Sequence, residues 1–309
     1  MLAVIRIRRM VEGCALVTAL ACAGCSVTPE PTVTSGKHSS SGNSDDNGSP
    51  SFGNAPSGSD PASPDAPAEN TTVAATTVYA HSPTTLFKLD PSNDAITVVG
   101  AFSGGCDEVI DLAIDASSNA YVTTMDGLFQ VNLASAACTP IASGTYPNSL
   151  SFVPKGTLDA NAEALVGYFD AEYVRIDPRS GALTTVGQLR SGYVSSGDIV
   201  SVTGGGSFLT VRGNGCGDCL LQVDPRTGDM IQNYGDLRHA NVFGLSFWAG
   251  TAYGFDDTGH VFSIAPQGSA IVTTDIALPN APPGLSFWGA GSTTSAPTKN
   301  ASGGGIPVR

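Results

Sequence analysis

Apolar and polar positions alternate in short runs from about residue 73 to residue 290, and these runs recur along the chain. In Leu86-Phe87-Lys88-Leu89 successive side chains would lie on opposite faces of a strand. A second run, Ile96-Thr97-Val98-Val99, is β-branched, as extended strands prefer. We predict that the two runs form a β-hairpin. Similar hairpins are predicted at residues 86–100, 128–142, 173–187, 220–234 and 261–275.

The residues between the two strands of a hairpin have the composition of tight turns. Residues 90–94 read Asp-Pro-Ser-Asn-Asp, residues 177–181 read Asp-Pro-Arg-Ser-Gly, and residues 224–228 read Asp-Pro-Arg-Thr-Gly. Proline presets one backbone dihedral, and short polar side chains accept hydrogen bonds from backbone nearby. The second hairpin lacks the Asp-Pro pair, and the fifth retains only Pro266.

A short apolar strand with small residues accompanies each hairpin. Small side chains suit strands that crowd around a central axis, so we predict that these are the innermost strands of repeated sheets. They are expected at 110–115, 149–154, 198–202, 244–248 and 284–288. A further strand is expected in each repeat, at 77–81, 119–124, 163–169, 207–212 and 251–255.

The repeat period and the two ends of the array predict the fold. The hairpins begin at residues 86, 128, 173, 220 and 261, and this spacing suits four-stranded propeller blades. The first copy has no innermost strand before it, and the strand at 284–288 has no hairpin after it. Together they complete one blade. We predict an all-β, five-bladed β-propeller over 73–290, closed by a C-terminal strand.

Two other architectures fit the sequence less well. An open β-sandwich is the simpler alternative, and a six-bladed ring would need a further repeat that the sequence does not contain. Helical periodicity is absent outside the first 25 residues, which argues against a helical domain.

The first 25 residues have the pattern of an export signal. Arg6, Arg8 and Arg9 precede a short apolar run that is too short to span a bilayer. Small residues before Cys25 are similar to the bacterial lipobox, in which the cysteine is acylated. Cys22 is the competing lipidation site, and an ordinary cleaved secretory signal is the remaining alternative.

Two segments have the composition of disordered chain. Residues 26–72 are rich in Ser, Pro, Gly and Asp, with Phe52 as the lone aromatic residue. Such a segment cannot bury enough apolar surface to offset its ordering entropy, so we expect a flexible tether. Residues 291–309 are expected to form a second disordered tail.

The net charge of −13 excludes some partners. An acidic surface does not favour nucleic acid, nor charge-driven adhesion to anionic lipid. Membrane contact is therefore expected through the lipid anchor only. No cofactor motif occurs, although an acidic protein leaves room for Ca²⁺.

Four cysteines follow the leader, and an even number in an exported chain suggests disulfides. Cys216 and Cys219 are expected to form a local bridge; a zinc half-site or a redox pair are the alternatives. Cys106 and Cys138 are left to pair with each other. The predicted strands place these two on opposite rims, so either the boundaries shift or the thiols are free.

Candidate binding residues gather on one face of the predicted ring. This face carries the connections between blades and those between second and third strands, and loops on a rigid scaffold commonly hold binding residues. The candidates are Asp107, Glu108, Asp111, Tyr146, Asn148, Tyr193, Asp198, His239 and Asn241. His260 is expected to be an exposed turn residue.

Asp111 and Asp198 form the most suggestive pair, because they occupy the same position in two innermost strands. Ser149, Gly244 and Gly284 are predicted at this register in the other blades. The two carboxylates could bind Ca²⁺, or could act as acid and base of a glycosidase. Alternatively they cap strands by accepting backbone hydrogen bonds.

The repeated Asp-Pro-x-[Ser/Thr]-Gly hairpins resemble those of uncharacterised bacterial surface and periplasmic lipoproteins with propeller repeats. The resemblance implies a cell-envelope location, and Ser26 after Cys25 implies sorting to the outer membrane. It implies noncatalytic binding or scaffolding of a glycan or an envelope protein. A carbohydrate-active enzyme, glycosidase or lyase, is the alternative function, and a purely structural surface protein is the third.

Overall fold

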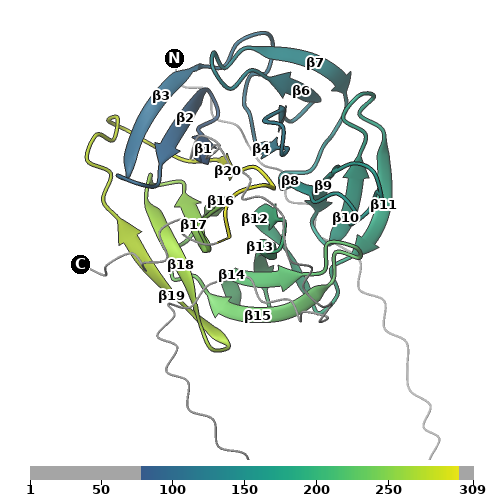
Figure 1. The fold of residues 1–309 in the computed structure, drawn as a ribbon, viewed down its shortest axis with the longest axis vertical. Helices are drawn as coiled ribbons and strands as arrows, with labels where there is room; N and C mark the ends of the chain where they lie inside the picture. The colour runs from purple at the N-terminus through teal and green to yellow at the C-terminus, as the bar shows by residue number, and fades with distance from the viewer. Residues whose placement is uncertain (1–77, 299–309) are drawn as a thin grey trace, which may run out of the picture. The chain divides into compact units, whose positions relative to one another are not determined.

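Residues 78–298 form a ring of five antiparallel sheets, each with four strands, in the computed structural model (Figure 1). The predicted five-bladed β-propeller is therefore confirmed. The predicted leader (1–25) and tether (26–72) lie outside the described residues. The elements between residues 78 and 298 are all strands, and none of these residues belongs to a helix that could cross a membrane.

Each blade contains four strands in order from the central axis outward. Blade 1 contains β20 (Gly289–Gly291), β1 (Val78–His81), β2 (Thr85–Asp90) and β3 (Ala95–Ala101). Blade 2 contains β4 (Asp111–Ile114), β5 (Ala120–Thr123), β6 (Gly127–Val131) and β7 (Cys138–Ser143). Blade 3 contains β8 (Leu150–Val153), β9 (Ala164–Phe169), β10 (Glu172–Ile176) and β11 (Leu183–Gln188). Blade 4 contains β12 (Tyr193–Val202), β13 (Gly206–Gly213), β14 (Cys216–Val223) and β15 (Met230–Asp236). Blade 5 contains β16 (Val242–Trp248), β17 (Thr251–Asp256), β18 (Val261–Gln267) and β19 (Ala270–Ile276).

Blade 1 closes the ring by joining the two ends of the described chain. In it β20 pairs antiparallel with β1, with Tyr79 opposite Gly291 and His81 opposite Gly289. The closing strand was expected at 284–288 and instead begins at Gly289. The expected segment follows two prolines, which cannot donate ladder hydrogen bonds, and its Phe287 packs edge-on against Phe87 and Phe255 in the core.

The hydrophobic core lies between neighbouring blades. One cluster joins Val200 and Phe208 of blade 4 to Leu245 and Phe262 of blade 5, and all four side chains are buried. Burial of apolar surface between every pair of sheets stabilises the ring as a single unit. The described loops are thereby held on a rigid scaffold.

The Asp-Pro turns at residues 177–181 and 224–228 also accept hydrogen bonds from tyrosine side chains outside their own hairpins. Tyr168 donates a hydrogen bond through its hydroxyl to the Gly228 carbonyl at 2.8 Å, and Tyr146 donates likewise to Gly181 at 2.9 Å. Gly228 has a φ of 71°, and a Cβ there would lie 2.4 Å from the Cβ of Tyr173. Both the backbone angle and the close ring therefore require glycine at this turn.

Two disulfides are present, Cys106–Cys138 and Cys216–Cys219, each with a Cα separation of 6.0 Å. The predicted conflict at the first pair came from treating every strand as parallel to the axis. Twist accumulates across a blade, so the outermost strands run around the circumference in Figure 1. The end of β3 therefore approaches the start of β7, where Cys138 donates its N–H to the Ser103 carbonyl at 2.8 Å.

The chain after β20 crosses the face that carries the connections between first and second strands. Thr293 bridges Ile114 of blade 2, and Thr203 of blade 4 donates its N–H to the Thr294 carbonyl at 2.9 Å. Ala296 is buried in the cluster of blades 4 and 5. Thr293, Thr294 and Ala296 of the predicted tail therefore contact the ring, and residues 299–309 lie outside the described residues.

Candidate functional site

Six of the nine predicted candidates lie in connections of the expected face, whereas Asp111 belongs to β4 and Tyr193 and Asp198 belong to β12. We call this face the loop face: residues 82–84, 102–110, 124–126, 144–149, 170–171, 189–192, 214–215, 237–241, 257–260 and 277–288. Asp107, Glu108, Asn148 and Asn241 are exposed there. Asp107 and Glu108 share the connection between β3 and β4, whereas Asn148 and Asn241 belong to two other connections. Asp107 and Glu108 line a pocket with Met125 and Asp126, and Asn148 is not part of its lining.

Two other candidates have structural partners. Tyr146 is buried, and its hydroxyl is bound to the Gly181 carbonyl as described above. Tyr193 is half-buried, and its hydroxyl accepts a hydrogen bond from the Asn233 amide at 2.9 Å. Asn241 also links loops, because its backbone N–H donates to Asp218 at 2.8 Å and its amide donates to Asp257 at 3.0 Å.

Asp111 and Asp198 meet at the ring axis and are fully buried. We call them the axial pair. Asp111 accepts the N–H of Leu112 at 2.7 Å on one oxygen and that of Leu150 at 2.5 Å on the other. Asp198 accepts the N–H of Ile199 and that of Leu245, both at 2.6 Å.

The axial pair therefore connects all five innermost strands. Asp198 also receives a backbone hydrogen bond from Ala290 of β20, and the two carboxyls are bonded to each other. The residues at this level of the axis are Asp111, Ser149, Asp198, Gly244 and Gly289. Gly289 thus replaces the predicted Gly284, as expected from the position of β20.

Burial raises the pKa of Asp111 well above the usual carboxyl range, and the nearby Asp198 carboxylate raises it further. Burial also raises the pKa of Asp198 well above its usual value, although bonds from Leu245 and Ile199 partly offset this. A proton shared between the two carboxyls satisfies both observations, because two adjacent carboxylates cannot both be ionised cheaply in a buried site.

His81 lies beside the axial pair and is also fully buried. Its Nδ1 lies 3.0 Å from the Ser82 carbonyl and its Nε2 has no hydrogen-bond partner. A Cβ at Gly289 would lie 2.3 Å from this Nε2 and 2.7 Å from Asp111 Oδ1. Burial lowers the pKa of His81 to about 4, so the ring is neutral near pH 7.

This geometry agrees with the strand-capping hypothesis for Asp111 and Asp198. A glycosidase pair needs carboxyls separated by roughly 5–10 Å with substrate between them, whereas these carboxyls are bonded to each other. Ca²⁺ requires six to eight oxygen ligands, and the carboxylate oxygens here already accept backbone N–H groups. The axial pair is therefore suited to holding strands together.

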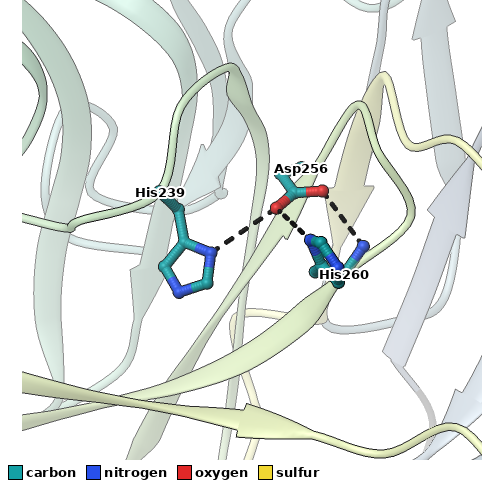
Figure 2. Close-up of side chains that lie close together, drawn as sticks. All are labelled: His239, Asp256 and His260. Atoms are coloured by element: carbon teal, nitrogen blue, oxygen red, sulfur yellow. Dashed lines mark hydrogen bonds and ion pairs between the residues drawn. The ribbon is translucent and has the colours of Figure 1, made fainter.

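A second titratable cluster lies on the loop face between blades 4 and 5 (Figure 2). It consists of His239, Asp256 and His260, and we call it the rim cluster. His239 comes from the connection between β15 and β16, Asp256 ends β17, and His260 precedes β18. One ligand atom from each residue lies within 4.8 Å of the other two.

Asp256 is the centre of the rim cluster. Its Oδ2 lies 3.0 Å from His260 Nδ1 and 3.5 Å from His239 Nδ1. Its Oδ1 accepts the Thr258 hydroxyl at 2.7 Å and the backbone N–H groups of Thr258 and His260, both at 3.0 Å. Burial raises the pKa of Asp256, but the bonds from Thr258 and His260 outweigh this effect and the net shift is downward.

The sequence indicated only part of the rim cluster. His239 was among the candidates, while His260 was expected to be an isolated exposed residue. His260 is exposed, but the four-residue spacing from Asp256 across a tight turn brings its ring back to the carboxylate. That spacing, at a turn on the same face as His239, is the signal that could have identified the cluster.

The sequence matches no protein-family model and no curated protein sequence. The fold is similar to solved structures at low identity. A chain from the crystal structure of a nidogen/laminin complex is 11% identical with a TM-score of 0.46, and the match covers 71% of this chain and 99% of that one. A protein of unknown function from Bacteroides caccae is 10% identical with a TM-score of 0.38, covering 69% of this chain and 77% of that one. The extracellular domain of a protein described as a one-component system from B. thetaiotaomicron is 14% identical with a TM-score of 0.35, covering 67% and 28% respectively. Similarity at this level does not transfer a function.

Proposed function

We propose that this protein is a lipid-anchored binding module of the cell envelope, and that its loop face docks a protein partner without catalysing a reaction. The export signal, the lipobox-like residues before Cys25 and the tether composition support the location. The propeller supports the role, because its rigid sheets hold many loops on one side.

The observation that carries the proposal is the contrast between the axis and the loop face. The carboxyls most suited to catalysis, Asp111 and Asp198, are buried and bonded to backbone. The exposed candidates lie on the loop face instead, with Asp107 and Glu108 in one loop and Asn148 in another. Dispersed polar residues suit a broad contact with a macromolecule better than they suit a small substrate.

Site-specific photo-crosslinking in the producing cell tests the role. A photoreactive residue at Glu108 or Asn148 on the loop face should give a discrete crosslinked protein. Lys155 and Ser117 are exposed in connections on the opposite face and provide matched controls that should not. Equal crosslinking from both faces would contradict the proposed surface.

A second measurement separates a protein partner from a glycan. The full exported chain is applied to a panel of envelope glycans, and glycan release is followed in parallel. Saturable glycan binding that Asn148→Ala abolishes would replace the protein partner with a sugar. Turnover of a glycan would contradict a noncatalytic role altogether.

The anchor is tested separately by metabolic labelling with an alkyne fatty acid. We expect incorporation into the wild-type chain and into Cys22→Ala, and none into Cys25→Ala. Loss of labelling in Cys22→Ala instead would assign the lipidation site to Cys22. Absence of labelling in the wild-type protein would contradict lipidation.

A further inference from the structure

We propose that the rim cluster is a binding site for zinc or a neighbouring divalent first-row transition metal ion, with His239 Nδ1, His260 Nδ1 and Asp256 Oδ2 as ligands. This inference goes beyond the proposed function and does not depend on it. The three residues come from two adjacent loops, so a bound ion would join the blade 4–5 connection to a turn of blade 5.

The spacing of the ligand atoms fits one shared ion. Tetrahedral ligands at ~2.0–2.1 Å from zinc lie roughly 3.3 Å from each other. Asp256 Oδ2 lies 3.5 Å from His239 Nδ1 and 3.0 Å from His260 Nδ1. The ligand atoms of all three residues lie within 4.8 Å of one another, so side-chain rotations could bring the two histidine nitrogens and the carboxylate oxygen around one ion.

The ligands are already oriented by their surroundings. The ring of His239 stacks on Phe262 with centroids 3.7 Å apart and an interplanar angle of 5°. Its Nε2 lies 3.4 Å from Asp275 Oδ1, on the side of the ring away from the ion. A carboxylate behind a metal-binding histidine fixes its tautomer and raises its basicity. Asp256 Oδ1 is held by Thr258 and His260, which leaves Oδ2 for the ion.

The donor types select the class of metal. Two imidazole nitrogens and one carboxylate suit zinc, copper or nickel, whereas Ca²⁺ and Mg²⁺ prefer oxygen alone. Three protein ligands leave the fourth position open. The side chain of His260 is 64% exposed, so water or a group from a partner can reach that position.

Metal binding through Nδ1 requires a change of histidine tautomer, and the arrangement accommodates this. Without metal, a histidine can bond to Asp256 Oδ2 only through a proton on its Nδ1. When the ion occupies the Nδ1 lone pair, the single proton of each neutral ring is on Nε2. At His239 that Nε2–H would point to Asp275. The competing interpretation is a hydrogen-bond network that only ties the two loops together.

Calorimetric titration with Zn²⁺ tests the proposal, using the full exported chain purified without a histidine tag and freed of metal by chelation. We expect one ion per chain. His260→Ala should weaken zinc binding by at least about 100-fold. This is the largest loss seen when residues that only hydrogen-bond to metal ligands are mutated, and His260 is itself a ligand. At a hundred times its dissociation constant zinc should raise the wild-type Tm by ~5–10 °C and leave that of His260→Ala unchanged.

Matched variants show whether the effect belongs to these residues. His38→Ala removes a histidine elsewhere in the sequence, and Asp257→Asn removes the neighbouring carboxylate; both should bind zinc within about twofold of wild type. Co²⁺ provides a spectroscopic probe, since nitrogen and oxygen ligands in a tetrahedral site give visible absorption.

His260 is largely exposed, so His260→Ala should fold, and its unfolding midpoint without metal verifies this. His239→Gln is a second variant that removes the other histidine ligand. Zinc affinity unchanged in both variants, or no zinc binding by wild type, would overturn the proposal.

Discussion

The axial pair and the rim cluster both contain an aspartate that accepts backbone hydrogen bonds, but they differ in their other partners and in their exposure. The axial carboxyls are fully buried and accept N–H groups of the innermost strands. The rim carboxylate also binds side chains, on loops that reach solvent. The function of a titratable cluster therefore depends on its partners. Carboxyl oxygens that are saturated by buried backbone N–H groups hold the fold together, whereas an oxygen bonded to histidine side chains near solvent can bind a metal ion instead.

The largest expected effect is at the axis. Asp198→Ala leaves the N–H groups of Ile199 and Leu245 buried without acceptors, and should lower the free energy of unfolding by about 3–5 kcal/mol. His260→Ala, at the exposed edge of the rim cluster, should cost under about 1 kcal/mol without metal. Urea denaturation measures the free energy of unfolding of both variants. Equal losses would contradict the assignment of a structural role to the axial pair and not to the rim cluster.

Asp198→Asn refines this test. Asparagine keeps one acceptor oxygen and can donate to Asp111, so the loss should be well below that of the alanine variant. An equally large loss would mean that the charge or the shared proton, and not the acceptor geometry, holds the strands.

Gly289→Ala tests the crowding around the axial pair. The added methyl would lie 2.3 Å from His81 Nε2, so the overpacked core should lose stability toward the upper end of ~1–3 kcal/mol. Gly217→Ala is the matched control, because a Cβ there meets no heavy atom within 4 Å. Thermal unfolding of the two variants compares them, and a stable Gly289→Ala would show that the axis has spare volume.

His81→Phe tests the pH dependence that the axis contributes. The pKa of His81 is lowered to about 4 by burial, so below its unfolded value of 6.5 the unfolded chain gains a proton that the folded chain resists. The stability contributed by neutral His81 is present above pH 6.5 and is lost as the pH falls toward 4. Between pH 7 and pH 5 this loss is about 2 kcal/mol.

The variant should lack that loss, while the raised pKa values of Asp111 and Asp198 act in the opposite direction in both proteins. Their shared proton adds stability as the pH falls, so the comparison of His81→Phe with wild type isolates the histidine. Denaturation curves at pH 7 and pH 5 that shift equally in the two proteins would contradict this account.

The smallest expected effect belongs to Asp275, behind the rim cluster. Asp275→Asn should weaken zinc binding by roughly 10-fold, or about 1.4 kcal/mol, with little change in metal-free stability because the side chain is exposed. Calorimetry measures the affinity. A larger effect on the metal-free protein than on zinc binding would favour a purely structural network.

Much of the fold could be predicted because its strands and turns are determined by residues that are close in sequence. Alternation in Leu86–Leu89 and the turn chemistry at Asp177 and Asp224 depend on neighbours in sequence, and repetition supplies the number of blades. The predicted position of the closing strand was wrong because residues 284–288 have the same sequence as residues 244–248 but do not form a strand. Phe287 instead packs against Phe87 and Phe255 in the core. Sequence similarity cannot distinguish a strand from a packed loop when the difference lies in distant contacts.

The sites were harder to predict because they depend on distances between blades. The shared register of Asp111 and Asp198 could be predicted, whereas their mutual hydrogen bond and the role of His81 could not. The contact between His239 and Asp256 joins the β15–β16 connection to the end of β17, and nothing in the local pattern specifies it. The Cys106–Cys138 bridge similarly depends on blade twist.

The pairing of β20 with β1 has a consequence for the order of events during biosynthesis. Polypeptides emerge from the ribosome and from export channels N-terminus first, so β1 must wait beside an open edge until Gly289–Gly291 arrives. Complete assembly of blade 1 is therefore coupled to arrival of nearly the whole described chain. A quality-control protease that cuts exposed strand edges would act in that interval, and a chain truncated before residue 289 would remain its substrate.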